Sequence, residues 1–169
     1  MAIITISHQY GSGGETVGRE VAVRLGFELI TPERVSEIIS ERYQLDYSLK
    51  GEISHTPRER ESGKLFSRLI SAVLADMALL NHLVILECGG QFIFRSFPNA
   101  LHVRITAPRE ARARHVMQAE SVSMEDALHK VEKQDRSHHR FLRSTFRCSS
   151  EIPEHYDLTI NTASLGISQ

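Results

Sequence analysis

The chain has 169 residues, of which 41% are hydrophobic and 24% are charged, so it can bury the core of one ordinary domain. Its net charge of −1 excludes a polycation that binds nucleic acid through overall charge, and no apolar run approaches the ~20 residues that span a bilayer. The opening residues lack a signal-peptide pattern, and the two cysteines, Cys88 and Cys148, have no metal-like spacing. We therefore expect one cytoplasmic domain, residues 1–169, with no membrane or nucleic-acid partner and with its oligomeric state left open.

The first part of the chain alternates short apolar runs with segments of helical periodicity. Residues Ala2–Ser7 (AIITIS) are typical of a buried strand, and a glycine-rich turn follows them. Apolar residues then recur at helical spacing until Gly26 ends the helix, and residues Phe27–Ile30 predict a second strand. Thr31 caps the next helix, which has Pro32 in its first turn.

The second part begins with a polar segment, residues 44–61, that lacks periodicity. We expect a mobile segment there rather than a linker between domains, because neither flank is a complete fold by itself. The remaining predicted elements are a long amphipathic helix from Ser62, strands over Leu83–Leu86 and Leu101–Ile105, a helix from Pro108, a charged helix that Ser123 caps and that runs to about Phe146, and a last strand over Asp157–Ile160.

Strands that alternate with helices predict an α/β fold with parallel strands and a sheet covered on both faces. Ligands bind such sheets at the carboxyl ends of the strands. The chemically informative residues should therefore follow the first, third and fourth strands.

The glycine-rich turn lies between the first strand and the first helix, which is the setting that a phosphate-binding loop requires. Glycine adopts the positive φ values of such a turn at low cost, and the N-terminus of the following helix favours an anion. The predicted phosphate-binding residues are Gly11, Ser12, Gly13, Gly14, Glu15 and Thr16.

This turn departs from the usual signature, G-x-x-x-x-G-K-[ST]. When the pattern is anchored on Gly13, the first glycine is replaced by His8, the lysine by Gly14 and the hydroxyl residue by Glu15. The lysine would neutralise phosphate and the hydroxyl would hold magnesium, so Thr16, the next residue, is a candidate metal ligand. A tight turn that binds no ligand is the alternative interpretation.

Four arginines, Arg136, Arg140, Arg143 and Arg147, share one face of the last long helix. Guanidinium groups suit phosphate because they are planar and always charged. We therefore predict that Arg136, Arg140 and Arg143 are catalytic and stabilise the transferred phosphoryl group. A solvated charged face, balanced by acidic residues of the same helix, is the alternative.

Two carboxylates are further candidates. Asp135 is predicted to be catalytic, by orienting Arg136 or a metal-bound water, although an ordinary partner within its own helix is equally compatible with the pattern. Glu87 follows the third strand directly, so it is a candidate magnesium ligand or base, with a structural hydrogen-bonding role as the alternative.

Several stretches resemble the cytidylate kinase-like family: ITISHQYGSGGETVGREVAVRLGF, VILECGGQFIFRSFPNALHVRITAPREARARHVM, SMEDALHKVEKQDRSHHRFLRSTF and YDLTINTASL. The resemblance covers nearly the whole chain. It implies a three-layer domain with a five-stranded parallel sheet in the order 2-3-1-4-5, a flap over roughly residues 32–81 and a helical lid over roughly residues 120–150. It also implies phosphate transfer from ATP to CMP or a similar monophosphate with Mg²⁺, and Arg112 as a nucleotide-binding arginine.

The chain differs from that family at positions that meet phosphates. Family members tend to have an arginine where Cys88 stands and commonly another where Glu15 stands. A phosphotransferase is therefore one hypothesis, and a catalytically weak or inactive nucleotide-binding relative is the second. An RNA-binding module that uses the arginine stripe is the third, and the absence of aromatic residues for base stacking beside the stripe argues against it.

Overall fold

The computed structural model describes residues 1–44, 57–148 and 152–165, with the side chains of the second range described from residue 63 onward. Most of the predicted mobile segment, residues 44–61, lies outside the described residues. Its last residues, 57–61, belong to a helix that begins five residues earlier than the predicted start at Ser62.

The sheet has five parallel strands in the order β2-β3-β1-β4-β5, which confirms the predicted α/β class and strand order. The central strand β1 pairs with β3 from Ile3 opposite Leu83, and with β4 from Ile3 opposite Ala100. The strands are β1 (Ile3–His8), β2 (Glu28–Ile30), β3 (Leu83–Leu86), β4 (Ala100–Thr106) and β5 (Leu158–Asn161).

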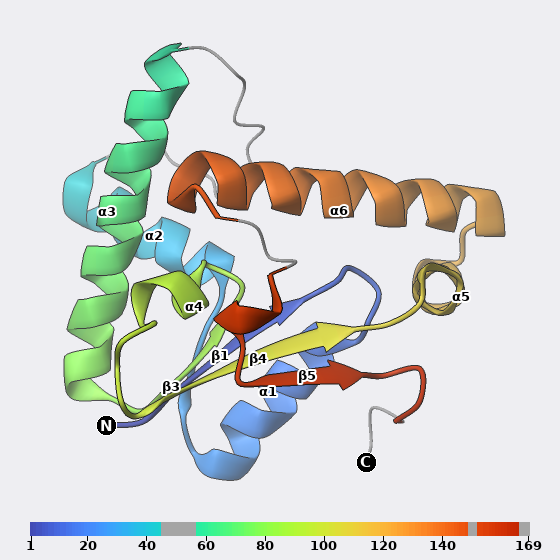
Figure 1. The fold of residues 1–169 in the computed structure, drawn as a ribbon, viewed down its shortest axis with the longest axis horizontal. Helices are drawn as coiled ribbons and strands as arrows, with labels where there is room; N and C mark the ends of the chain where they lie inside the picture. The colour runs from blue at the N-terminus through green and yellow to red at the C-terminus, as the bar shows by residue number, and fades with distance from the viewer. Residues whose placement is uncertain (45–56, 149–151, 166–169) are drawn as a thin grey trace.

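Helices cover both faces of this sheet (Figure 1). One face carries α1, and the other carries α2, α3 and α4, with α6 crossing beyond them. Buried aliphatic residues form a separate core on each face, because side chains along a strand alternate between the two sides. The helices are α1 (Gly14–Leu25), α2 (Pro32–Tyr43), α3 (Pro57–Leu80), α4 (Gly90–Ile93), α5 (Arg109–Glu120) and α6 (Met124–Phe146).

The strand and helix bounds differ from the predicted ones by one or two residues, apart from the start of α3. The sequence did not predict α4 or the short 3₁₀ helix Pro153–His155. Neither element is long enough to show an apolar repeat. Among the described residues, no helix combines the length and the apolar character needed to cross a bilayer.

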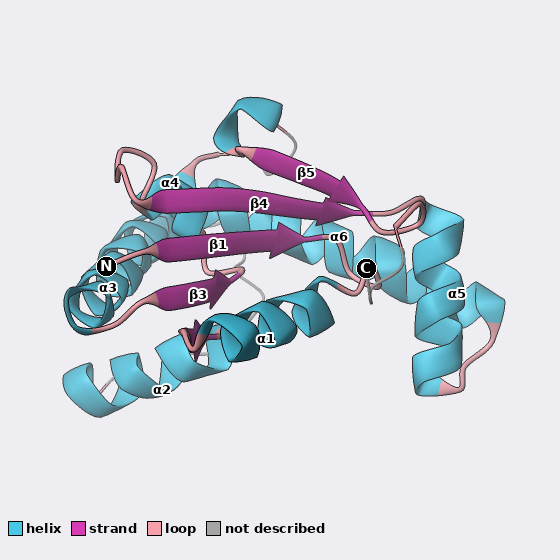
Figure 2. Ribbon diagram, turned by 90° about the horizontal axis from the view of Figure 1, so that it is seen from below, coloured by secondary structure: helices cyan, strands magenta, loops and turns pink. Residues whose placement is uncertain are grey.

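The helix α5 lies beyond the carboxyl ends of the strands (Figure 2), and α6 runs back from it across the domain (Figure 1). Ser123 caps α6 by accepting a hydrogen bond from the Asp126 amide at 3.1 Å, as predicted. Ala113 and Val116 of α5 and Ala127 and Val131 of α6 form a small core between the two helices.

A buried ion pair also joins α5 to α6. The guanidinium of Arg112 donates two hydrogen bonds to the Asp135 carboxylate, at 3.0 and 2.9 Å. It also donates to the carbonyl oxygens of Ala107 and Tyr10, each at 3.1 Å. Four donors of one buried arginine are thereby satisfied inside the protein, and the ion pair holds the middle of α6 against α5.

We predict that Asp135→Asn lowers the free energy of unfolding by about 1–3 kcal/mol, because it leaves the buried Arg112 charge without its partner. Glu132→Gln is the matched control, since the ion pairs of Glu132 among the described residues are with the exposed Arg109 and Arg136, and their loss should change stability by less than about 0.5 kcal/mol. Urea unfolding of both variants checks the difference. Equal effects would mean that the pair does not hold α6.

Candidate functional site

A cleft of about 600 Å³ opens where β1 and β3 end, on the side of the sheet that α6 crosses. Its wall comes from the ends of these strands, the first turns of α1 and α2, the middle of β4, and one side of α6. This position agrees with the prediction that ligands meet the carboxyl ends of the strands. The polar part of the lining includes His8, Glu15, Glu87, Arg104, Lys133 and His138.

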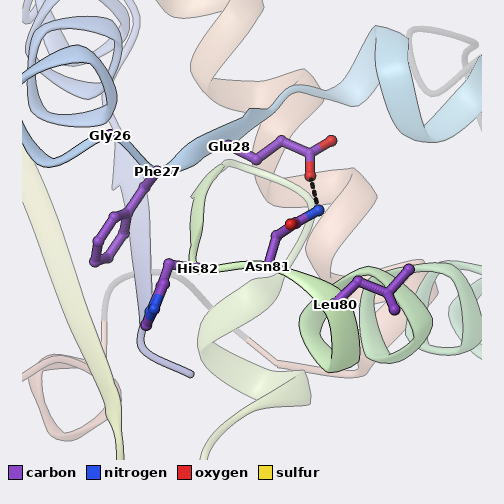
Figure 3. Close-up of a pocket in the computed structure, with 6 residues that line it drawn as sticks. All are labelled: Gly26, Phe27, Glu28, Leu80, Asn81 and His82. Atoms are coloured by element: carbon purple, nitrogen blue, oxygen red, sulfur yellow. Dashed lines mark hydrogen bonds between the residues drawn. The ribbon is translucent and has the colours of Figure 1, made fainter.

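A second hollow, of about 390 Å³, lies at the opposite ends of β2 and β3 (Figure 3). There Phe27 stacks on His82 with ring centroids 4.9 Å apart, and Asn81 donates a hydrogen bond to Glu28 at 2.7 Å. These polar side chains are thus already paired with one another, and the hollow faces the amino ends of the strands. We assign the candidate site to the larger cleft.

The glycine-rich turn at the edge of the cleft has the backbone of an anion-binding loop. Gly11 and Gly13 have φ values of 79° and 77°, and Gly13 is the N-cap of α1. Ser12 donates its amide to the Gln9 carbonyl oxygen at 3.0 Å. Within the described residues, the amides of residues 13–16 have no protein acceptor, so they are free for a ligand.

The carbonyl groups of the same turn are held by other parts of the chain. His115 on α5 donates its Nδ1 hydrogen to the Gly11 carbonyl oxygen at 3.0 Å. Thr162, just after β5, donates its hydroxyl to the Ser12 carbonyl oxygen at 2.8 Å. The Ser12 hydroxyl is buried and has no partner among the described residues. The turn is therefore fixed through its acceptors while its donors remain unused.

The close approach of His8 to Gly14 explains why the loop has no lysine. A Cβ atom built on Gly14 would lie 2.2 Å from the Cβ of His8, which is far inside van der Waals contact. A lysine at position 14 would need the glycine that phosphate loops carry at position 8. The two departures from the usual signature are therefore one coupled change.

Glu87 connects the cleft to α6. Its Oε1 accepts the His8 amide hydrogen at 2.7 Å, and its Oε2 lies 2.8 Å from Nδ1 of His138. Burial raises the pKa of Glu87, but the charges and hydrogen bonds of His138 and His8 outweigh it and lower the pKa to about 2. Burial lowers the pKa of His138, yet the Glu87 carboxylate raises it above 6.5 overall. The pair is therefore a carboxylate and an imidazolium in mildly acidic solution.

The backbone around Glu87 is strained. The backbone φ values of Glu87, Cys88 and Gly89 are 59°, 49° and 69°, and residues other than glycine rarely adopt such positive values. The Cys88 thiol is buried, and burial together with the nearby carboxylates raises its pKa, so it stays protonated. The strained turn thus presents a carboxylate but no cation to the cleft.

The residues that line the cleft do not include the arginines of the stripe, Arg136, Arg140, Arg143 and Arg147. The cleft-facing residues of this helix include Gln134, His138 and Phe141. At 3.6 residues per turn, Arg136, Arg140 and Arg143 are roughly half a turn away from them. All three are exposed. Arg136 forms an ion pair within the helix, with its Nη1 3.7 Å from Oε2 of Glu132.

The other predicted residues have definite partners. Arg112 and Asp135 bind each other, so Arg112 has little capacity left for a nucleotide, and Asp135 pairs with α5 rather than with Arg136. Glu15 is exposed at the edge of the cleft and pairs with Arg19 at 2.8 Å. Thr16 is exposed in the first turn of α1.

The two candidate metal ligands differ in their fit to magnesium. Both oxygens of Glu87 already accept hydrogen bonds, which argues against a metal there. Thr16 is exposed in the first turn of α1, close in sequence to the loop glycines, and a hydroxyl there is compatible with an ion that arrives with a phosphate chain. The described residues contain no group of three or more metal-ligating side chains.

Arg104 was missed by the sequence analysis. It lies in β4, is buried with only 9% of its surface exposed, and lines the cleft. The signal was present in the strand LHVRIT, where His102 and Arg104 alternate with aliphatic residues. This period of two places both polar side chains on one face of an otherwise apolar strand.

A sequence model of the cytidylate kinase-like family matches residues 3–164. The chain is 23% identical to a cytidylate kinase of Pyrobaculum calidifontis over 168 residues, which are 99% of this chain and 88% of the relative. It is 25% identical to a cytidylate kinase of Ignicoccus hospitalis over 167 residues, 98% of this chain and 92% of the relative.

Two solved structures show the same fold. An uncharacterized protein from Eubacterium ventriosum superposes with a TM-score of 0.73 at 20% identity, over 95% of this chain and 88% of that one. A gluconokinase from Sinorhizobium meliloti superposes with a TM-score of 0.53 at 14% identity, over 96% and 83% of the two chains.

The Glu87–His138 pair predicts a pH dependence of stability. The lowered pKa of Glu87 stabilises the fold above pH 4.5, and this contribution is lost as the pH falls toward 2. The raised pKa of His138 stabilises the fold below pH 6.5, and this contribution is lost as the pH rises through the folded-state value.

We therefore expect His138→Gln to lose the most unfolding free energy, about 1–3 kcal/mol, between pH 4.5 and 6.5, and less at higher pH. His129→Gln, on the same helix but without an ion pair in the described residues, is the control. Urea unfolding at a series of pH values measures both. A His138→Gln effect that stays constant across this range would contradict the pair.

The His8–Gly14 contact predicts non-additive mutations. Gly14→Ala should cost about 1–3 kcal/mol of unfolding free energy, because the added methyl collides with His8. In a His8→Gly background the same change should cost clearly less, since the colliding atom is gone. A double-mutant cycle by urea unfolding measures the coupling, and simple additivity would show that the contact does not restrict position 14.

Proposed function

We propose that this chain, since it belongs to the cytidylate kinase-like family, transfers the γ-phosphate of ATP to a nucleoside monophosphate such as CMP. One observation carries the proposal: the loop amides of residues 13–16 are unpaired beside a cleft at the carboxyl ends of the strands. Such amides at a helix N-terminus suit a phosphate chain. The same cleft is large enough for a second ligand beside it.

In this proposal the loop binds the triphosphate and the cleft binds the acceptor. Magnesium would be held by phosphate oxygens and by the Thr16 hydroxyl, where it would neutralise developing charge. The protein contributes position and electrostatics, because phosphoryl transfer needs little covalent chemistry from side chains. The buried walls of the cleft would exclude water, which otherwise competes with the acceptor hydroxyl.

A catalytically weak or inactive nucleotide-binding relative is the second candidate. Two observations favour it: the loop has no lysine, and Glu15 brings negative charge to the edge of the cleft. Both would weaken the binding of a triphosphate by removing or opposing the charge that neutralises it.

Formation of ADP from ATP with each common nucleoside monophosphate, with and without Mg²⁺, separates the two candidates. We expect Mg²⁺-dependent turnover with CMP or a similar monophosphate. Nucleotide binding without turnover for any acceptor would establish the second candidate. Glu15→Arg should tighten ATP binding by roughly 10- to 150-fold, since one charge-assisted contact is worth about 1.5–3 kcal/mol. Glu20→Arg, one turn further along α1, is its control, and equal effects would contradict a role for Glu15.

The side of α6 that acts on phosphate can be tested by a matched pair of variants. We propose Arg136, Arg140 and Arg143 as lid arginines that reach the cleft if α6 turns on closing. Without such a turn, Lys133 is the lysine of α6 that lines the cleft. Lys133→Ala should therefore reduce kcat/KM more than Arg143→Ala. A loss of ~10³-fold in Arg136→Ala or Arg143→Ala would reverse this order and show that the helix rotates during catalysis.

A further inference from the structure

Arg104 is a buried cation without a carboxylate partner. Within the described residues, no acidic oxygen lies within ion-pair distance of its guanidinium. Its one hydrogen bond goes from Nη1 to the Tyr156 hydroxyl at 3.2 Å, and its Cζ lies 5.4 Å from the centre of that ring. A guanidinium has five N–H donors, so most of its capacity remains unused. Keeping such a group buried costs stability, which indicates a role other than folding.

Two further polar atoms near Arg104 also lack partners. Ser7 pairs with Arg104 in the register of β1 and β4, so both side chains are on the same face of the sheet. The Ser7 hydroxyl is buried and makes no hydrogen bond to a described residue. The Nε2 atom of His138 is likewise buried and unpaired, while its Nδ1 contacts Glu87.

Arg104 and His138 line one cleft, and Ser7 is beside Arg104 on the same face of the sheet. The positive charge of Arg104 is near enough to oppose the rise in the pKa of His138. The strained turn after β3 offers a thiol at Cys88 and no positive charge. The cationic part of this wall is therefore supplied by the sheet and by α6.

We propose that Arg104, Ser7 and His138 form a subsite for the phosphate group of the acceptor, an inference that rests on the proposed transfer to a nucleoside monophosphate. The guanidinium offers parallel N–H donors to two phosphate oxygens, and the Ser7 hydroxyl and the His138 imidazole can donate to the same group. Arg104 is then the residue that distinguishes a phosphorylated acceptor from its free nucleoside.

Calorimetric titration with CMP, cytidine, inorganic phosphate and ATP tests this assignment. Wild-type protein should prefer CMP to cytidine, and Arg104→Met should weaken CMP binding about 10- to 100-fold while leaving cytidine and ATP within twofold. Arg104→Lys should recover only part of the affinity, because an ammonium lacks the planar fork. Arg95→Met, which removes an exposed arginine between α4 and β4, should change none of these values.

Stability measurements separate this role from a structural one. Within the described residues the buried cation has no carboxylate partner and the Ser7 hydroxyl has no hydrogen bond. Arg104→Met and Ser7→Ala should therefore melt at the same temperature as the wild type or higher, and Ser7→Ala should still weaken CMP binding several-fold. A lower melting temperature of Arg104→Met with an unchanged preference for CMP over cytidine would overturn the proposal. If the wild type binds CMP and cytidine equally and Arg104→Met does not weaken the binding of inorganic phosphate, the subsite is also overturned. If the wild type binds CMP and cytidine equally but Arg104→Met weakens the binding of inorganic phosphate, the subsite is supported and the nucleotide acceptor is contradicted.

Discussion

The carboxylate of Glu87 joins the three segments that enclose the cleft. It follows β3, accepts the amide hydrogen of His8 where β1 ends, and contacts His138 on α6. A carboxylate held between two donors in a largely buried position costs little as long as both remain in place. Glu87 therefore contacts the end of β1 and the crossing helix at once, and the left-handed backbone at residues 87–89 places its carboxylate between them.

The positive charge around this cleft is distributed differently from that of a lysine-bearing phosphate loop. The loop has no lysine because His8 occupies the space beside Gly14, and the arginines of α6 face solvent. The cations Arg104, Lys133 and His138, which line the cleft, come from the sheet and from α6. One of them is an imidazole, whose charge depends on pH in the physiological range, so the field in the cleft is adjustable in a way that a lysine-bearing loop is not.

Periodicity in the sequence was sufficient to predict the strands and the longer helices, because each has an apolar repeat that packing requires. The strand order came from the resemblance to the cytidylate kinase-like family, since an apolar repeat does not record which strands are neighbours. It could not predict α4, which has four residues. The arginines of α6 were correctly placed on one face, but the face that turns inward is set by Ala127, Val131 and Leu142, which are buried. Those apolar positions already indicated that the inward face of α6 is opposite the face that carries Arg136, Arg140 and Arg143. The contacts of Glu87 and Arg104 depend on side chains far apart in the chain, which no local pattern records.

The central position of β1 has a consequence for how the chain reaches this structure. Ile3 is paired with Leu83 and Ala100, so both edges of the first strand find their partners only after most of the chain exists. During synthesis, this strand of β-branched residues would leave the ribosome early, and the backbone N–H and C=O groups along both of its edges would remain unpaired. Distant pairing of this kind slows folding and exposes the unpaired edges to other chains. The first strand is therefore the part of the sheet that stays unpaired longest during synthesis.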